Sequence, residues 1–291
     1  MKNATLKTFT FLLAFAMVIA LFPATSLFAA SNYSYDTKTK TLTISYVGAM
    51  PTYDTLAKRP WDTYSNSANK IVIKNGITSI SDIAFYNFHH VTEIVWPTDG
   101  KLKTIGNSAF YCCCDLKSLV LPKGVTSIGN FAFENCEQLS KISLPGTLKT
   151  IGMCAFAVDY GGDMKYTSLS IPSSVTSIGS YAFFNNDNLK SVTGGSGLVS
   201  IGSYAFYSCA KLATFKITSK KLKTIGAYAF KSCPKLKTIY ITKTTKLTKK
   251  TVKNSLKSSS VKTVKVKSTK VKTYKKYFTK SNCGRKVTVK K

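Results

Sequence analysis

Acidic residues and histidines are scarce in this sequence. Its 291 residues include 12 Asp and Glu and only two His, against 42 Lys and Arg, which gives a formal net charge of +30. Eight cysteines are present, but no two have the Cys-x-x-Cys spacing, so a zinc site is not expected. Little material is left for acid–base or metal chemistry. The sequence therefore disfavours most hydrolases and metalloenzymes, and we expect neither a cofactor nor an enzymatic activity.

Long apolar runs are missing except at the N-terminus. Lys2 and Lys7 precede an apolar stretch from Phe9 to Phe22, and Pro23 interrupts it before it reaches the ~20 residues that a membrane span needs. This order is typical of a secretory signal peptide, which we place at residues 1–30; an uncleaved anchor is the alternative. We therefore predict a secreted, extracellular or cell-wall-associated protein with no transmembrane helix after signal removal.

The positive charge is concentrated near the C-terminus. Residues 31–210 hold all 12 acids and carry a net charge of +2, whereas residues 211–291 hold 26 Lys and Arg and no acid. This asymmetry indicates a polyanionic partner, such as an anionic wall polymer, a glycosaminoglycan or extracellular DNA, or else a role in solubility alone. Lysine lacks the bidentate fork of arginine, so we expect no specific nucleic-acid readout. The candidate polyanion-binding residues are Lys262, Lys265, Lys267, Lys270, Lys272, Lys275 and Lys276.

One motif, Ile-Gly-x-x-Ala-Phe, recurs through the body of the chain at spacings of 23 to 27 residues, and a degenerate copy stands at Ile80–Phe85. Glycine would permit a sharp turn there, and Ala and Phe would fold inward. Between the copies runs Leu-x-x-Ile-x-Leu-Pro, whose alternation predicts a strand with one buried face. The phenylalanines of the intact copies are Phe110, Phe133, Phe156, Phe183, Phe206 and Phe230.

A unit of about 23 residues cannot bury its apolar side alone, but stacked units form a continuous core. The period and pattern predict a mostly β repeat protein, a leucine-rich repeat solenoid with short parallel strands, turns and little helix. Because the end coils would otherwise expose a hydrophobic column, we expect caps at both ends. We assign residues 31–69 to an N-terminal cap, 70–242 to the solenoid and 243–291 to a Lys-rich C-terminal cap, in which 248–257 could form a short helix.

More narrowly, the segment Val125–Cys136 (Val-Thr-Ser-Ile-Gly-Asn-Phe-Ala-Phe-Glu-Asn-Cys) and its sister copies resemble the BspA-like leucine-rich repeat family of bacterial surface proteins. The flanking segments, with Pro60-Trp61 on one side and Val261–Val266 and Lys286–Val289 on the other, resemble the caps of such proteins. The resemblance implies a surface or extracellular interaction role such as adhesion.

Four cysteines share one repeat position, three residues after the Phe of the motif. Asn186 occupies this position in another copy and Phe88 in the first. A position shared by Cys, Asn and Phe indicates packing, with Cys acting as a small hydrophobe. Bridges between adjacent coils remain the alternative. The four residues are Cys113, Cys136, Cys209 and Cys233.

The two histidines provide the best enzymatic alternative. An offset of 25 residues, the length of the first repeat, places His89 beside Cys114 and His90 beside Asp115 on the next coil. A Cys–His pair is the minimum for thiol catalysis, but the sequence offers no third orienting group. We therefore favour a surface turn with stacked polar side chains.

The outward positions of the predicted strands form a candidate binding face for a protein or glycan ligand. This face is rich in Ser and Thr and turns basic toward the C-terminus, and it could equally be a solvated surface. A structural protein that associates with itself at the cell surface is a further alternative. The candidate face residues are Val120, Ser143, Ser170, Thr193, Lys216 and Tyr240.

Overall fold

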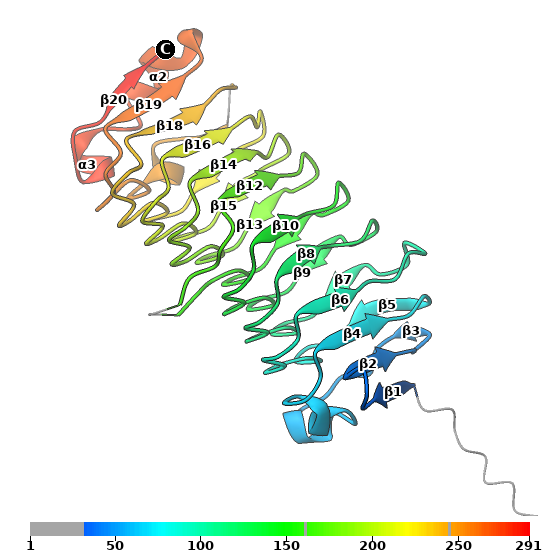
Figure 1. Cartoon of the computed structure of the whole chain (residues 1–291). Helices are drawn as coiled ribbons and strands as arrows, with labels where there is room; N and C mark the ends of the chain where they lie inside the picture. Colours follow the sequence, from blue (N-terminus) through cyan, green and yellow to red (C-terminus); the bar gives the residue numbers. More distant parts are fainter. Residues whose placement is uncertain (1–31, 160–161, 244–245) are drawn as a thin grey trace, which may run out of the picture. The chain divides into compact units, whose positions relative to one another are not determined.

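The computed structural model describes residues 32–159, 162–243 and 246–291. The predicted signal peptide lies outside these residues. Residues Tyr33–Lys291 form one compact unit, in which successive coils of the chain stack on one another (Figure 1). The prediction of a mostly β leucine-rich repeat solenoid with little helix is confirmed.

One strand of each coil comes from the Leu-x-x-Ile-x-Leu motif. These strands pair in parallel with their counterparts in the neighbouring coils and form sets of three, two and six strands, and an antiparallel strand at the N-terminus extends the set of three to a sheet of four. Alternate residues are buried, as in the pattern exposed–buried–exposed–buried of β16. The strands are β2 (Thr41–Ile44), β4 (Lys70–Ile73), β6 (Glu93–Val95), β8 (Ser118–Val120), β10 (Lys141–Ser143), β12 (Ser168–Ile171), β14 (Ser191–Gly194), β16 (Thr214–Ile217), β18 (Thr238–Ile241), β19 (Thr263–Val266) and β20 (Thr288–Lys290).

In the repeat coils, a second strand ends at the Ile of Ile-Gly-x-x-Ala-Phe or of its degenerate copy, and the short strand β3 (Gly48–Ala49) in the N-terminal segment pairs with the first of them. Together they form one parallel sheet of eight, and the isoleucines of the other seven strands face the core. These seven strands are β5 (Ile77–Ile80), β7 (Thr104–Ile105), β9 (Ser127–Ile128), β11 (Thr150–Ile151), β13 (Ser177–Ile178), β15 (Ser200–Ile201) and β17 (Thr224–Ile225).

The motif glycine has a different role from the sharp turn expected of it. The positive φ angles of the turn belong to other residues, for example Tyr204 (57°) and Ser208 (59°). A Cβ added at Gly152 would instead lie 2.5 Å from the backbone of Gly129 in the preceding coil. The glycine is therefore required by the close approach of successive coils.

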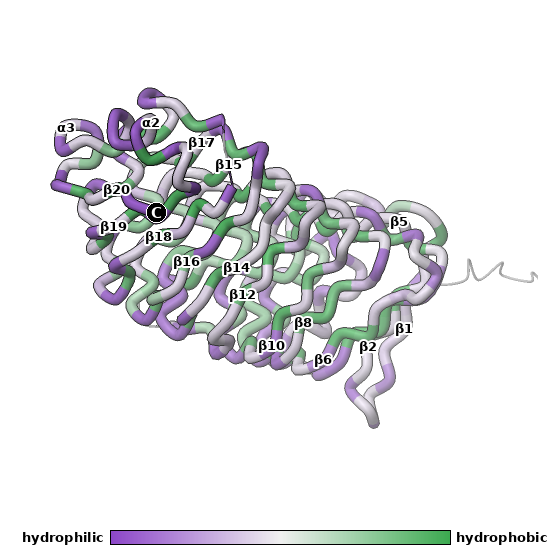
Figure 2. Tube along the Cα trace, turned by 90° about the horizontal axis from the view of Figure 1, so that it is seen from above, coloured by the Kyte–Doolittle hydropathy of each residue, from purple (hydrophilic) through white to green (hydrophobic). Residues whose placement is uncertain are grey.

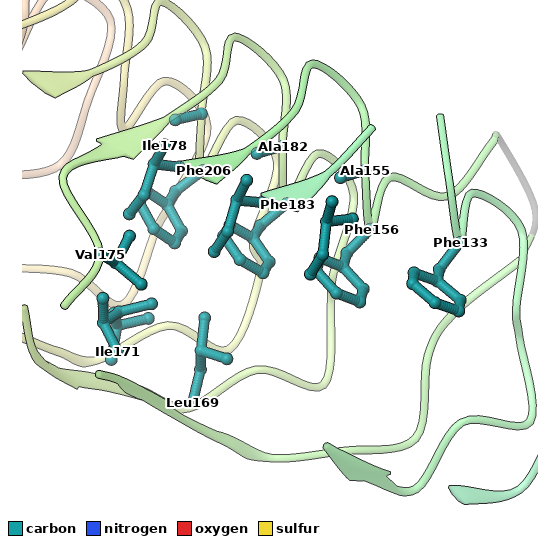
Figure 3. Close-up of a cluster of buried hydrophobic side chains, with 14 of the residues drawn as sticks. Phe133, Ala155, Phe156, Leu169, Ile171, Val175, Ile178, Ala182, Phe183 and Phe206 are labelled. Atoms are coloured by element: carbon teal, nitrogen blue, oxygen red, sulfur yellow. The ribbon is translucent and has the colours of Figure 1, made fainter. Parts of the chain in front are cut away.

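The motif phenylalanines form a single column through the core. The rings of Phe133, Phe156, Phe183 and Phe206 follow one another with centroid separations of 5.5, 5.5 and 5.2 Å and nearly parallel planes, as Figure 3 shows. Phe110 and Phe230 extend the column at either end. All six side chains are fully buried.

The N-terminal end is closed by residues outside the repeat pattern. Strand β1 (Tyr33–Asp36) pairs with β2 in antiparallel orientation, and the 3-10 helices η2 (Leu56–Lys58) and η3 (Asp62–Tyr64) follow. The buried Arg59 donates hydrogen bonds to the carbonyls of Ile83 and Tyr86 at 2.8 and 3.1 Å. Trp61 Nε1 donates to the carbonyl of Ala84 at 2.8 Å. Together they donate to carbonyls of the first repeat turn, against which no earlier repeat turn stacks.

The ladder of parallel strands continues without interruption past residue 242, where we placed the end of the solenoid. Strand β19 pairs in parallel with β18, and β20 with β19. The prediction of a short helix at 248–257 is wrong. Only the 3-10 helix η4 (Lys250–Val252) forms there, and Asn254 and Ser258 adopt the positive φ angles of the repeat turns. The basic region therefore continues the coils. The 3-10 helix η5 (Ser268–Lys270) and the helices α2 (Val271–Lys275) and α3 (Lys280–Cys283) follow β19, and Tyr274 and Phe278 are buried there.

Candidate functional site

The lysines predicted to bind a polyanion belong to different elements of the C-terminal region. Lys265 points outward from β19, and Lys262 precedes this strand. Lys267 precedes η5, and Lys270 is its last residue. The remaining three, Lys272, Lys275 and Lys276, belong to α2 and its C-terminal end. The predicted lysines are therefore divided between β19 with its flanks, η5 and α2, and their binding of a polyanion stays a prediction.

The outward residues of the strands form in-register columns, which we call the strand face. Val120 lies beside Ser143, and further along Ser170, Thr193, Lys216 and Tyr240 follow one another from coil to coil. All except the half-buried Tyr240 are exposed. The prediction that these side chains point outward from one surface agrees with their position, whereas their role in binding stays a prediction.

The predicted strand-face residues and the predicted polyanion-binding lysines become neighbours at one place in the strand register. Tyr240 is paired with Lys216 on one side and with Lys265 on the other, and Lys265 is paired with Lys290. The ammonium group of Lys265 lies 5.7 Å from the centre of the Tyr240 ring. Sequence reasoning missed Lys290, although its offset of 25 residues from Lys265 repeats the period of the coils.

Two shallow grooves adjoin this column. One, of about 470 Å³, is lined by Lys220, Thr242, Lys243 and Lys267. The other, of about 220 Å³, shares Thr242 and Lys267 and adds Tyr240, Lys265 and Lys291 among its lining residues. The helical lysines line neither groove. The grooves and the column together form a cationic surface at the C-terminal end of the strand face.

The shared cysteine position is a packing position that also makes a hydrogen bond. The buried thiols of Cys113, Cys136, Cys209 and Cys233 each donate to the carbonyl of the motif Phe in the preceding coil, at 3.5, 3.4, 3.2 and 3.0 Å. Asn186 donates to the equivalent carbonyl, that of Phe156, at 2.7 Å. All eight cysteines are free thiols in the structure. Cys and Asn therefore act here as small donors that fit beneath the Phe column, whereas Phe88 fills the same position in the first copy by packing alone.

The predicted neighbours of the two histidines are confirmed. Cys114 Sγ lies 3.6 Å from His89 Nδ1, and His90 Nδ1 lies 3.3 Å from a carboxylate oxygen of Asp115. Cys114 also interacts with the thiol of Cys112. The hydrogen bond between these two side chains raises the pKa of Cys114 well above its usual range and lowers the pKa of Cys112 to about 7. The side chain of Asn135 also donates to Cys112 Sγ at 3.7 Å. A raised pKa disfavours the thiolate form of Cys114, which is the form that acts as a nucleophile.

Cys112 should be the most reactive thiol of the folded chain. We expect iodoacetamide to modify it before the other seven cysteines, at a rate that rises with pH through about 7 as the thiolate forms. Peptide mapping by mass spectrometry after short exposures measures this order, and the Cys112→Ser variant should lose the fast phase. Faster labelling of Cys114 would contradict the assignment and restore Cys114 as a candidate nucleophile.

Within residues 32–159, 162–243 and 246–291, no group of three or more His, Cys, Asp or Glu side chains could hold a metal ion. None of the helices in the described part of the chain has the length and apolar character needed to cross a membrane.

Comparison with known proteins agrees with this architecture. The family model described as the BspA type leucine rich repeat region matches residues 63–159 and 160–284, in six copies. The crystal structure of a leucine rich repeat protein from T. pallidum is similar, with 22% identity and a TM-score of 0.52, over 70% of this chain and 86% of that one. No curated protein matches significantly.

Two further solved structures show lower similarity. The pneumococcal vaccine antigen PcpA is 19% identical, with a TM-score of 0.33, over 89% of this chain and 96% of that one. A leucine rich cell surface protein from Faecalibacterium prausnitzii is 18% identical, with a TM-score of 0.31, over 89% and 93%. Because the family model matches most of its residues, the chain belongs to the BspA-type leucine-rich repeat family.

Proposed function

We propose that this protein is a secreted or cell-surface binding protein, of the kind that mediates adhesion, and that its basic C-terminal region holds an anionic wall polymer. The observation that carries the proposal is the net charge of residues 211–291, where 26 Lys and Arg are accompanied by no acid. Nonspecific electrostatic attraction to a polymer of phosphate or carboxylate groups is the natural use of many lysines. The export signal predicted at residues 1–30 would bring the protein to such a polymer.

The arrangement of the chain supports different roles for the two ends of the strand face. In the column of the strand face that runs from Val120 and Ser143 to Lys216, the N-terminal positions carry small or apolar side chains, and Lys216 is the first lysine after them. Figure 2 shows hydrophilic stretches on the coils toward the C-terminal end, around β16 to β20. A polymer held at the basic end would leave the neutral part of the strand face open to a protein or glycan ligand.

Electrostatic attachment predicts a strong salt dependence. We expect the full chain to sediment with isolated bacterial cell walls at low ionic strength and to be released near 1 M salt, where the Debye length falls to about 3 Å. Walls from which the anionic polymer has been extracted are the control and should retain little protein. Binding that persists at high salt, or that is equal on extracted walls, would overturn the proposal.

A further inference from the structure

We propose that the polymer is an anionic glycan and that it lies across strands β16, β18, β19 and β20, along the column formed by Lys216, Tyr240, Lys265 and Lys290. This inference rests on the proposed function and names its site and ligand class. The four strands lie side by side at the C-terminal end of the ladder (Figure 1).

The spacing of the column suits a linear polymer that carries charge at regular intervals. Neighbouring strands of a sheet lie about 4.8 Å apart, so Lys265 and Lys290 are one such step apart and Lys216 and Lys265 are two. Lys216 and Lys290 are exposed. A chain with a charged group on every one or two units could therefore contact all three ammonium groups while running straight along the coils.

The charges of this column are not neutralised by the protein itself. Among the residues that the structure describes, the ion pairs all lie in the N-terminal part, and the last of them joins His90 and Asp115. The adjoining grooves add Lys220, Lys243 and Lys267. An anion bound there would meet several ammonium groups at once.

A second column favours a sugar over a bare polyphosphate. Thr214, Thr238, Thr263 and Thr288 are paired in register from strand to strand. They stand two residues before the Lys and Tyr column and hence on the same face, about 6.6 Å away along each strand. Hydroxyl groups can both donate and accept hydrogen bonds, and the Tyr240 ring adds an apolar surface with a polar tip. Hydroxyls beside ammonium groups and an aromatic ring match the hydroxyls, charges and apolar faces of an acidic polysaccharide.

The helical lysines offer a control with the same charge. The triple variant K216Q/K265Q/K290Q removes three charges from the column, and K272Q/K275Q/K276Q removes three from α2 and its end. All these lysines except Lys265 are exposed, and Lys265 is half-buried. Both variants should keep the fold, which circular dichroism and thermal melting check. A purely nonspecific attraction would be weakened equally by the two variants, because their net charge is the same.

The test measures binding of dextran sulfate, a glycan probe, and of inorganic polyphosphate, a probe without sugar, by isothermal calorimetry. We expect the column variant to lose about tenfold in affinity for dextran sulfate, from three weak charge contacts, and the helical variant to lose no more than about threefold. The variant Tyr240→Thr should weaken dextran sulfate binding and leave polyphosphate binding unchanged. Threonine is chosen because it already occurs in the same column, at Thr193.

The outcomes separate the site from the proposed function. If the wild-type chain binds cell walls but the two triple variants weaken dextran sulfate binding equally, the site is wrong and the electrostatic anchor stands. If polyphosphate or duplex DNA binds the column as tightly as dextran sulfate and Tyr240→Thr weakens each of them equally, the assignment to a glycan is wrong. If the wild-type chain binds neither the walls nor either probe, the proposed function itself fails.

Discussion

The variant Gly152→Ala is expected to lower the free energy of unfolding by about 3 kcal/mol, the upper part of the usual range for overpacking. An added Cβ would lie 2.5 Å from the carbonyl carbon and oxygen of Gly129. Both coils are fixed here, because the amide of Gly152 donates to Ile128 at 2.9 Å and that of Gly129 donates to Ile105 at 2.9 Å. No flexible side chain can move aside, so the backbone of two coils must separate. Urea denaturation followed by circular dichroism measures the loss.

Gly146 provides a matched control in the same coil. A Cβ added at this position meets nothing within 4 Å, and the residue is exposed. Gly146→Ala should therefore leave stability unchanged or raise it by up to about 1 kcal/mol through a smaller entropy of the unfolded chain. Equal losses for the two variants would contradict the view that the glycine of the motif is required by the approach of successive coils.

The repeat period allowed most of the architecture to be predicted from the sequence. Residues at equal positions in successive copies must stack in a solenoid, so the Phe column and the neighbours His89–Cys114 and His90–Asp115 followed from spacing alone. The reason for the glycine did not follow, because a sequence records that a side chain is absent but not what would occupy its place. The close approach becomes visible only when the backbone of the preceding coil is known.

The candidate site was harder to predict from the sequence, because the basic region departs from the repeat period of the coils. After Tyr240 the Ile-Gly-x-x-Ala-Phe motif disappears, and no spacing then tells which lysines belong to strands. The nearly continuous run of lysines therefore suggested one cluster. The structure divides it into strand lysines such as Lys265 and helical lysines such as Lys275. Tyr166 was missed for a similar reason, since it follows the loop insertion and its hydroxyl group donates to Asn186 in the next coil.

The variant Phe183→Ala should cost about 3 to 5 kcal/mol, the usual range for removing a buried aromatic ring. Phe183 is fully buried, and its ring centre lies 5.5 Å from that of Phe156 and 5.2 Å from that of Phe206. The cavity would open in the middle of the column, where neither neighbour can follow without leaving its own stack. Urea denaturation of the variant and the wild type gives the difference.

The adjacent residue, Phe184, separates the effect of the column from the loss of a ring. Phe184 is half-buried at the turn and stacks on Tyr207 with a centroid separation of 5.1 Å, so Phe184→Ala should cost about 1 kcal/mol. Because each coil contacts only its neighbours, hydrogen exchange in Phe183→Ala should accelerate most in the coils that contain Phe156, Phe183 and Phe206. Protection around Trp61, at the N-terminal end, should change least. Uniform acceleration along the chain would mean that the coils unfold as one cooperative unit rather than through the pairwise contacts of the Phe column.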